Sequence, residues 1–352
     1  MSKINVAIAG VGNCASSLIQ GLFFYKDWKS DDVPGLMHKT VGGYEVSDIA
    51  IVAAFDVDAK KVGKDVSEAI WAGPNCTMKF SDVPKLGVKV LAGPILDGVP
   101  AHLATKVKIT DEKPVDVVKV LRESKAEVLV NILPTGSAEA SRFYANAAIE
   151  AGAGFVNGIP ELIVCDEKFA RKAEEKGVPL VGDDFKSQVG GSILHRDLIN
   201  LFLQRGIKLK RSYQLNYAGN TDFLNLINRG ESKHKTKLGA VTSILPYDAW
   251  IDVNFSYIEV QEDNKVCRIL MEGENFGKTP IRINAELEVV DSANSAGVLV
   301  DALRCCKLAL DRGIGGVLAS ASAYLMKHPP KQFKDAEARQ MLDEFIAGKR
   351  QR

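Results

Sequence analysis

Basic side chains crowd together in one short segment of the second half of the chain: Lys233, His234, Lys235 and Lys237. Lys233 and Lys237 are four residues apart, so in a helix they would share one face. By composition alone, a charge run of this kind is more typical of a solvated helix face. Held together in a cleft, however, lysines have lowered pKa values and suit a substrate phosphate or a developing alkoxide. The segment is therefore a candidate catalytic site.

Two other segments carry small polar side chains. Ser187 and Gln188 follow a predicted strand and open a predicted helix, where their side chains and the free backbone N–H groups could hold an anion. Ligands of open α/β sheets bind at that end of the strands. Residues 215–222 are predicted to form a tight turn that presents further small polar side chains.

A dinucleotide-binding fingerprint lies near the N-terminus, where a near-continuous apolar strand runs into a helix. Gly10 permits the tight turn, Gly12 lets the backbone approach a pyrophosphate, and the helix start offers N–H groups and a partial positive charge. The motif continues through Asn13, Cys14 and Ala15, with Ala in the third glycine position. The alternative is a strand–helix turn without a ligand. Cys14 is interpreted as a small packing residue and not as a nucleophile.

The acid that normally contacts the cofactor ribose lies about 20 residues after the fingerprint. Here the acid at the end of the second strand is Asp56, so the stretch 27–47 must be an insertion. We interpret Asp56 as the ribose ligand, against the alternative of an ordinary turn residue at a strand end. An acid there favours NAD over NADP because it repels a 2′-phosphate.

These residues must be positioned by the elements around them. Short apolar runs alternate with helical patterns through the first two hundred residues, which is typical of a doubly wound, mostly parallel sheet. The predicted strands cover 4–10, 49–56, 128–132, 154–157 and 178–181, and the predicted helices cover 114–124, 137–151, 167–176 and 190–204. Residues 71–110 are predicted to be loop with short elements.

The pattern changes between residues 250 and 290. Apolar and polar residues alternate over 251–257 and 281–289, which indicates half-exposed antiparallel strands. A helical pattern resumes at residue 292 and ends at Gly313. We therefore predict an α/β fold with a Rossmann-like doubly wound parallel sheet, formed by residues 1–200 and 293–352, and an inserted α+β domain at 201–292.

Composition excludes several functions. The 45 Lys and Arg residues nearly balance the 44 Asp and Glu residues, and a net charge of +1 gives no basic footprint for nucleic acid or an anionic membrane. No apolar run approaches the roughly 20 residues that span a bilayer, and the N-terminus enters a predicted strand at once, so no signal peptide fits. The six cysteines show no metal-ligand spacing and favour free thiols. We expect a cytoplasmic protein with no nucleic-acid or membrane partner.

Six sequence strings together resemble the prokaryotic-type inositol-1-phosphate synthases: GVGNCASSL, NILPTGS, FVNGIPE, GDDFKSQVGGS, NYAGNTDFLNL and ESKHKTK. Further matches around Lys265, Asp291 and Lys327 extend the similarity over essentially the whole chain. The resemblance implies an NAD-dependent enzyme whose inserted domain is catalytic and forms the contacts of a homotetramer.

The resemblance also implies roles for individual residues. The catalytic residues would be Lys233, Lys237, Lys265, Lys327, Asp222 and Asp291. The cofactor would contact, besides the fingerprint and Asp56, the residues Asn131, Pro134, Thr135, Asp183 and Asp184, of which Asp184 also matches an active-site aspartate. The substrate phosphate would contact Lys186, Ser187 and Gln188. Members of the family differ over a divalent metal ion, and no His/Cys cluster in this sequence identifies a site for one.

The implied reaction converts glucose 6-phosphate into 1D-myo-inositol 3-phosphate. NAD oxidises C5, the C6 enolate closes the ring on the C1 aldehyde, and the hydride returns to the ketone, so the net reaction is an isomerisation. Negative charge develops on several oxygens, which explains why ammonium groups recur. The alternatives are a conventional NAD(P)-dependent dehydrogenase with net redox turnover and a dinucleotide-binding sensor without catalysis. A sensor would need no lysines beyond the cofactor pocket.

Overall fold

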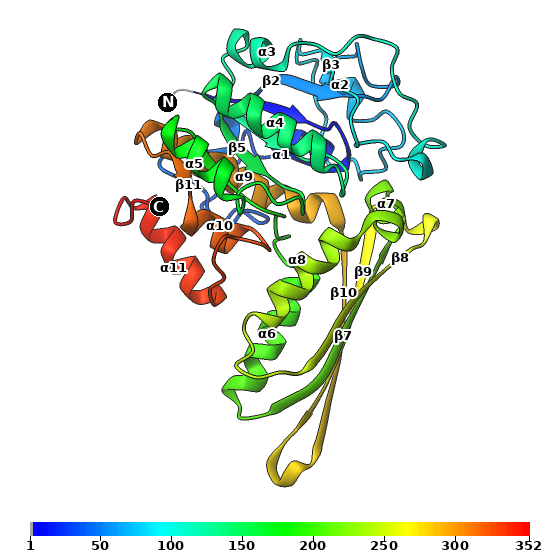
Figure 1. Cartoon of the computed structure of the whole chain (residues 1–352), viewed down its shortest axis with the longest axis vertical. Helices are drawn as coiled ribbons and strands as arrows, with labels where there is room; N and C mark the ends of the chain where they lie inside the picture. The colour runs from blue at the N-terminus through cyan, green and yellow to red at the C-terminus, as the bar shows by residue number, and fades with distance from the viewer. Residues whose placement is uncertain (1–2) are drawn as a thin grey trace.

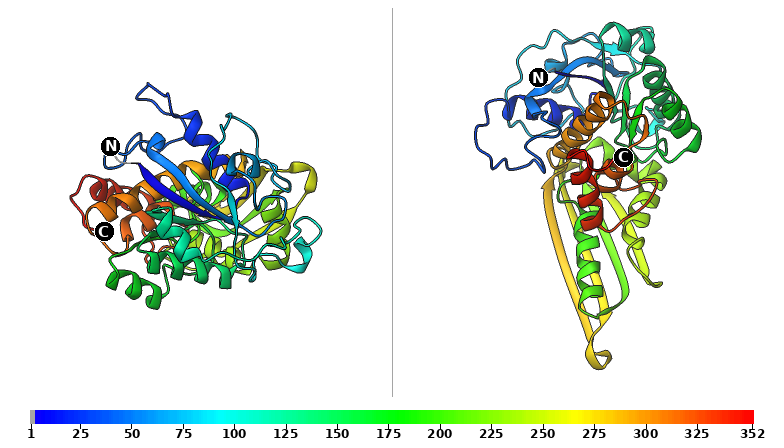
Figure 2. Two further views of the ribbon diagram at one scale, coloured as in Figure 1. Left: turned by 90° about the horizontal axis from the view of Figure 1, so that it is seen from above. Right: turned by 90° about the vertical axis from the view of Figure 1, so that its left-hand side faces the viewer.

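A computed structural model of the chain describes residues 3–352 and contains two β-sheets in different parts of the molecule (Figure 1). A seven-stranded sheet with helices on both faces forms a body that carries both chain ends. A four-stranded sheet, together with two long helices, forms an arm that extends from the body. The right-hand view of Figure 2 also shows the arm extending away from the body.

The body sheet is parallel throughout, and its strand order is β11-β6-β5-β4-β1-β2-β3. Its strands are β1 (Ile4–Ala9), β2 (Ile49–Asp56), β3 (Val90–Ala92), β4 (Val128–Asn131), β5 (Gly154–Asn157), β6 (Pro179–Val181) and β11 (Gly316–Val317). The order from β3 to β6 is that of a dinucleotide-binding Rossmann fold, whose ligands bind where the order reverses, between β1 and β4. The predicted fold class is confirmed. Strand β11, which comes from the C-terminal region, was not predicted.

Both faces of the body sheet are buried, so successive residues of β1 pack into two different hydrophobic cores. Ile4, Val6 and Ile8 pack against one set of helices, whereas Ala7 and Ala9 pack against the other. The first set is α1 (Asn13–Phe24), α9 (Asp291–Asp311), α10 (Ala319–Leu325) and α11 (Asp335–Ile346). The second is α3 (Val117–Glu123), α4 (Ala138–Ala151) and α5 (Glu167–Glu175). Burial on both faces explains why these strands are near-continuous apolar runs. The short helix α2 (Val66–Ala69) precedes the segment 71–110 that was predicted to be loop with short elements, and β3 is one of the short elements within it.

The arm contains the strand order β10-β9-β7-β8. Its elements are α6 (Gly191–Gln204), β7 (Lys208–Ala218), α7 (Thr221–Arg229), α8 (Glu231–Thr242), β8 (Trp250–Tyr257), β9 (Asn264–Glu274) and β10 (Pro280–Val290). Helices α6 and α8 cover one face, where Ile199, Phe202 and Ile269 form a separate core. The β9–β10 hairpin reaches farthest from the body (Figures 1 and 2).

The structure corrects the predictions for the arm in two places. Residues 215–218, predicted as part of a turn, belong to β7, and the turn is confined to Gly219 and Asn220 before α7 begins. Strand β8, predicted to be antiparallel, pairs with β7 in parallel. The reason is the connection, because α7 and α8 form a crossover that returns the chain to the same end of the sheet. Strands β7 and β9 were not predicted as strands.

Helix α6 lies with the arm, although the predicted boundary at residue 200 would divide it. Its side chains Ile199 and Phe202 join the arm core, and the helix packs on β7, β9 and α8. We therefore propose to place the start of the inserted domain at Gly191.

Candidate active site

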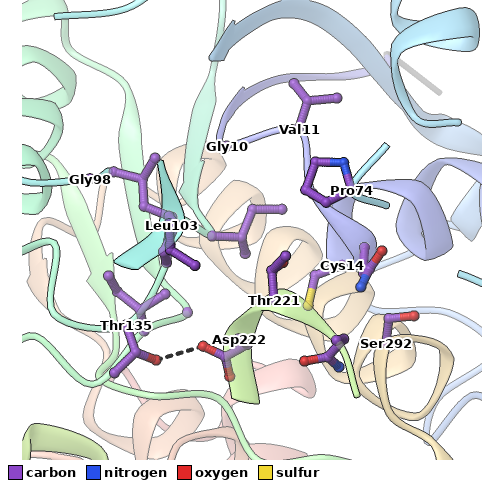
Figure 3. A pocket seen from close by; sticks show the side chains of 18 of the residues that line it. Gly10, Val11, Cys14, Pro74, Gly98, Leu103, Thr135, Thr221, Asp222 and Ser292 are labelled. Carbon is purple, nitrogen blue, oxygen red and sulfur yellow. Dashed lines mark hydrogen bonds between the residues drawn. The ribbon is translucent and has the colours of Figure 1, made fainter. Parts of the chain in front are cut away.

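A large cavity lies at the carboxyl ends of the body strands and extends to the arm (Figure 3). Its walls include Gly10 after β1, Asp56 at the end of β2, Pro134 after β4 and Gly158 after β5. All six predicted catalytic residues line the same cavity: Lys233, Lys237, Lys265, Lys327, Asp222 and Asp291. The sheet edge thus joins the fingerprint to side chains that are far apart in sequence.

The fingerprint loop has the geometry that a dinucleotide needs. Gly10 has φ +95°, and a Cβ there would lie 2.8 Å from the Ile132 carbonyl oxygen, so only glycine fits. A Cβ at Gly12 would meet no described atom within 4 Å and would point into open space. Helix α1 begins without a side-chain cap or an acid in its first turn, so its N–H groups can receive a pyrophosphate. Asn13 and Cys14 line the cavity beside them.

Asp56 lines the cavity but also holds the fingerprint loop. Its Oδ2 accepts a hydrogen bond from the Val11 N–H at 2.8 Å, and its Oδ1 accepts from the backbone of Val57 and Asp58. Lys61 lies 3.9 Å from Asp56. Asp58 is a second acid at this end, and its Oδ2 is buried without a partner among residues 3–352. A ligand hydroxyl at this position would satisfy such an acceptor.

Several residues predicted to contact the cofactor do not line the cavity: Ala15, Asn131, Asp183 and Asp184. Asn131 is buried and donates to Ser141 and Asn157, which fixes neighbouring strand ends. Asp183 is also buried and accepts from Asn157 and from three consecutive backbone N–H groups. These side chains support the loops around the cavity. Thr135 does line it, and its hydroxyl donates to Asp222 at 2.9 Å (Figure 3).

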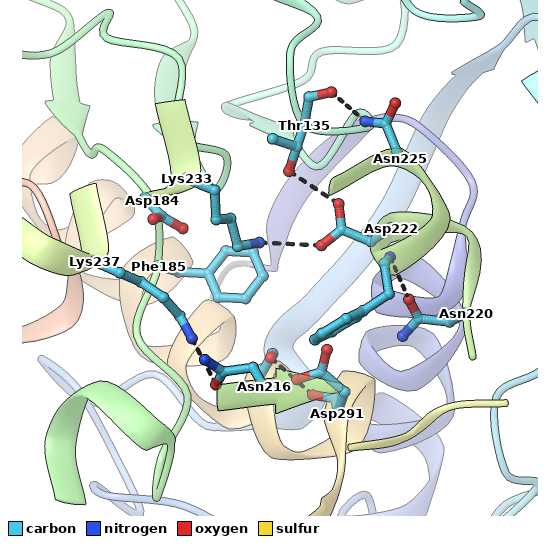
Figure 4. A network of polar contacts seen from close by, with 12 residues as sticks. Thr135, Asp184, Phe185, Asn216, Asn220, Asp222, Asn225, Lys233, Lys237 and Asp291 are labelled. Carbon is cyan, nitrogen blue, oxygen red and sulfur yellow. Dashed lines mark hydrogen bonds and ion pairs between the residues drawn. The ribbon is translucent and has the colours of Figure 1, made fainter. Parts of the chain in front are cut away.

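Four lysines meet on the arm side of the cavity. Lys233 and Lys237 come from one face of α8, Lys265 from β9, and Lys327 from the segment after α10. Three of them have a carboxylate partner: Lys233 with Asp222 at 3.1 Å, Lys265 with Asp291 at 2.7 Å, and Lys327 with Asp184 at 2.7 Å. The ammonium of Lys237 instead donates to the Asn216 side chain at 2.9 Å (Figure 4).

The surroundings shift the pKa values of these lysines in opposite directions. Burial alone would lower the pKa of Lys233, but the carboxylates around it, led by Asp222, raise it above its usual range. Burial and the repulsion of the other ammonium groups hold the pKa of Lys237 well below its usual range. Burial also lowers the pKa of Lys327, to about 8, although Asp184 opposes the shift. The cavity therefore combines a fixed ammonium with two lysines that can lose a proton.

The neighbouring basic residues have other surroundings. Lys235 points to solvent and pairs with Glu231 on the exposed side of α8. His195 is buried, bonds to Ser212, and has its pKa lowered to about 4 by burial. Helix α8 therefore has one face that lines the cavity, with Lys233 and Lys237, and one solvated face, with Lys235.

The three residues predicted to contact the substrate phosphate do not all line the main cavity. Ser187 lines the main cavity, whereas Lys186 and Gln188 line a second cavity that Ser187 also borders. The Lys186 ammonium donates to Asp335 at 3.1 Å and to the Ala323 carbonyl. Lys186 therefore ties the segment to α11 and is not among the groups facing the lysines.

Two buried residues of the site were not found in the sequence. Asn216 lies on β7 and receives the Lys237 ammonium, and Asp263 precedes β9 and lines the cavity. Their sequence signal was polarity alone, because Asn216 lies inside a segment that pairs as a central strand and Asp263 immediately precedes another. Among residues 3–352 no group of three or more His, Cys, Asp or Glu side chains could hold a metal ion, and no metal ligand is assigned.

The fold and the cavity define an enzyme of the dinucleotide-binding class with a lysine-rich substrate site. A family model described as myo-inositol-1-phosphate synthase matches residues 190–292. Two inositol-3-phosphate synthases, from Mycolicibacterium smegmatis and Corynebacterium glutamicum, are 51% and 49% identical to the chain, with 98% of each protein covered. A solved myo-inositol-1-phosphate synthase-related protein from Thermotoga maritima has a TM-score of 0.81 at 25% identity, over 98% of both chains.

The chain belongs to the inositol-3-phosphate synthase family, and the family predicted from the sequence is confirmed. The conventional dehydrogenase is not favoured.

Proposed function

We propose that the chain converts glucose 6-phosphate into 1D-myo-inositol 3-phosphate with NAD as a recycled cofactor. The observation that carries this proposal is the meeting of four lysines and two aspartates beyond the dinucleotide end of one cavity. A cofactor-binding sensor has no use for these groups. An enzyme that forms and discharges several oxyanions on one substrate does.

The residues at each end of the cavity have separable tasks. The α1 start, Gly12 and Asp56 would hold NAD, which when bound supplies a hydride acceptor beside the substrate. Lys233, kept as an ammonium by Asp222, would stabilise negative charge on a substrate oxygen. Lys237, whose pKa is lowered, can take a proton, and Lys327 can give one near neutral pH. Ser187 at the cavity wall would receive the substrate phosphate.

The reaction should require NAD without consuming it. Purified chain incubated with glucose 6-phosphate and a small amount of NAD should form many equivalents of inositol phosphate, while absorbance at 340 nm shows no matching rise. The reason is that the proposed isomerisation returns each hydride to its own substrate. NADH that accumulates in step with product would favour the conventional dehydrogenase.

We propose that the arm also forms a homotetramer. Helices α6 and α8 cover one face of the arm sheet, and no helix within residues 3–352 packs across the other face. That face carries the exposed rings of Tyr213 and Trp250 beside the ion pairs Arg211–Glu272 and Arg268–Glu286. Aromatic and arginine side chains are enriched in protein interfaces.

Light scattering should therefore give four copies at micromolar concentration. The Trp250→Glu variant should dissociate into smaller species, because it places a charge on this face. The matched variant Trp71→Glu, on the body, should leave the assembly intact. A monomeric wild-type protein would contradict the proposal.

None of the helices within residues 3–352 is long and apolar enough to cross a membrane. We propose a cytoplasmic location, which the six free cysteines support.

A further inference from the structure

One buried carboxylate, that of Asp263, contacts the starts of two helices that present acids to the cavity. The residue lies immediately before β9, two positions from Lys265, and is 3% exposed. It lines the same cavity as the four lysines. Unlike Asp222 and Asp291, it has no lysine or arginine within 4.0 Å among the described residues. Its oxygens are used for other contacts.

The first contact is with the start of α7. Asn220 caps this helix, because its Oδ1 accepts the Phe223 N–H at 3.1 Å. The Nδ2 of the same side chain donates to Oδ1 of Asp263 at 3.1 Å (Figure 4 shows Asn220 next to Asp222). Asp263 thus fixes the capping residue, and the second residue of α7 is Asp222, the partner of Lys233.

The second contact is with the start of α9. Val290 precedes this helix and has no side chain that could cap it. The Asp263 Oδ2 caps the helix instead, because it accepts from both the hydroxyl and the backbone N–H of Ser292. The Asp263 backbone carbonyl accepts the Asp291 N–H at 2.9 Å. A carboxylate also suits the partial positive charge of a helix start. The first residue of α9 is Asp291, the partner of Lys265.

The chain of contacts continues to the dinucleotide end. The Ser292 hydroxyl, which donates to Asp263, also accepts from the Ser17 hydroxyl at 2.9 Å. Ser17 is buried in α1, the helix that the fingerprint opens. One connected set of buried hydrogen bonds therefore joins the cofactor helix to the starts of α7 and α9.

We propose that Asp263 is a positioning residue, which fixes the Lys233–Asp222 and Lys265–Asp291 pairs relative to each other and to the cofactor helix. This inference rests on the catalytic roles proposed for the two lysines. Small displacements of reacting groups are expensive, since a shift of about 1 Å can cost roughly 10²-fold in rate.

The charge state of Asp263 gives the proposal a pH signature. Burial and the nearby Asp291 raise the pKa of Asp263 to about 6. The titratable groups that face it from other elements are Asp291 of α9, Cys14 of α1 and Cys76 of the loop after α2. Below about pH 6 the carboxyl gains a proton and loses an acceptor for Asn220 or Ser292, so the wild-type kcat should fall there.

The test compares Asp263→Asn with Glu262→Gln, its exposed neighbour, in the full chain. The Asn side chain has the same size but turns a donor towards Ser292 or Asn220. We expect kcat to fall by about 10²-fold with KM for glucose 6-phosphate and Kd for NAD changed less than threefold, and the kcat decline near pH 6 to disappear. Glu262→Gln should behave as wild type in all three measurements.

A second variant and a second readout keep the proposal testable if Asp263→Asn folds poorly. Ser292→Ala removes the hydroxyl contacts with Asp263 and Ser17 but leaves the contact between Asp263 and Asn220, and it should lower kcat less than Asp263→Asn without adding to it in the double variant. In Asp263→Asn, backbone hydrogen exchange should be faster than in the wild type in the first turns of both α7 and α9, with or without substrate. Wild-type kcat and wild-type exchange in Asp263→Asn would overturn the inference. Absence of inositol phosphate in the wild-type assay would instead reject the proposed function, and the exchange experiment would still decide the positioning role.

Discussion

Replacing Lys237 by Ala should reduce turnover by on the order of 10²–10³, while NAD still binds and the chain stays folded. Lys237 is 3% exposed, and its amine faces the cavity through Asn216 with its pKa held well below the usual range. No carboxylate within residues 3–352 lies within 4.0 Å of this amine, so its removal leaves no acid unpaired. Inositol phosphate formation at saturating substrate measures the effect, and calorimetric titration measures NAD binding.

The same helix supplies the control. Lys235→Ala removes a solvated lysine whose pair with Glu231 is exposed on both sides, so turnover should stay near that of the wild type. The variants Lys233→Ala, Lys265→Ala and Lys327→Ala should also lose most activity. Equal losses in Lys235→Ala and Lys233→Ala would mean that the helix acts through its total charge, and the assignment of individual lysines would be wrong.

The Asp184→Asn variant should lose about 3–5 kcal/mol of unfolding free energy near pH 6.5, because it leaves a buried lysine without its partner. Asp184 is 1% exposed and accepts from Lys327 and from the Thr236 hydroxyl. Its φ is +61°, a conformation that Asn also tolerates, so the backbone should not change. Urea unfolding followed by circular dichroism measures the difference.

The sign of the pH dependence tests this explanation. The folded state lowers the pKa of Lys327 to about 8, below its unfolded value, and the loss of Asp184 lowers it further. The loss of unfolding free energy in Asp184→Asn is therefore largest well below pH 8, where the Lys327 ammonium is buried without a carboxylate. The loss becomes smaller as the pH rises to about 8. The exposed pair of Lys235 with Glu231 is the matched control, and Glu231→Gln should leave the unfolding free energy near that of the wild type at any pH. If Asp184→Asn loses the same unfolding free energy at pH 6.5 and at pH 9.5, the loss of the Lys327–Asp184 pair is not its cause.

The body could be predicted from the sequence because its strands are buried on both faces and its fingerprint is local. The arm strands β7 and β9 could not. The inner face of β7 carries Ser212, Gln214 and Asn216, which are buried yet polar, so the usual alternation of apolar and polar residues is absent. Residues 269–271 of β9 are apolar on both faces of the sheet, and such a short apolar run has no period.

The site was predicted unevenly for similar reasons. The lysines were identified by resemblance, but their convergence depends on the crossover that places α8 beside β8 and on the return of the chain through α10. Asp184 and Lys186 are two residues apart but have different surroundings, because Asp184 accepts from Lys327 whereas Lys186 lines the second cavity, and a linear motif cannot show this difference. Asp263 was missed because nothing in a single acidic residue before a strand indicates that two helix starts depend on it.

The place of α9 in the body also determines how the chain can be made. This helix covers the body sheet with Val298, Leu299 and Leu303, and β11 pairs with β6, yet both follow the whole arm in the sequence. A ribosome therefore releases the first six body strands with one apolar side covered only in part, mainly by α1, and synthesises about a hundred further residues before α9 follows. The body should consequently need protection from aggregation during translation, and a fragment that ends at residue 200 should not yield a soluble cofactor-binding unit.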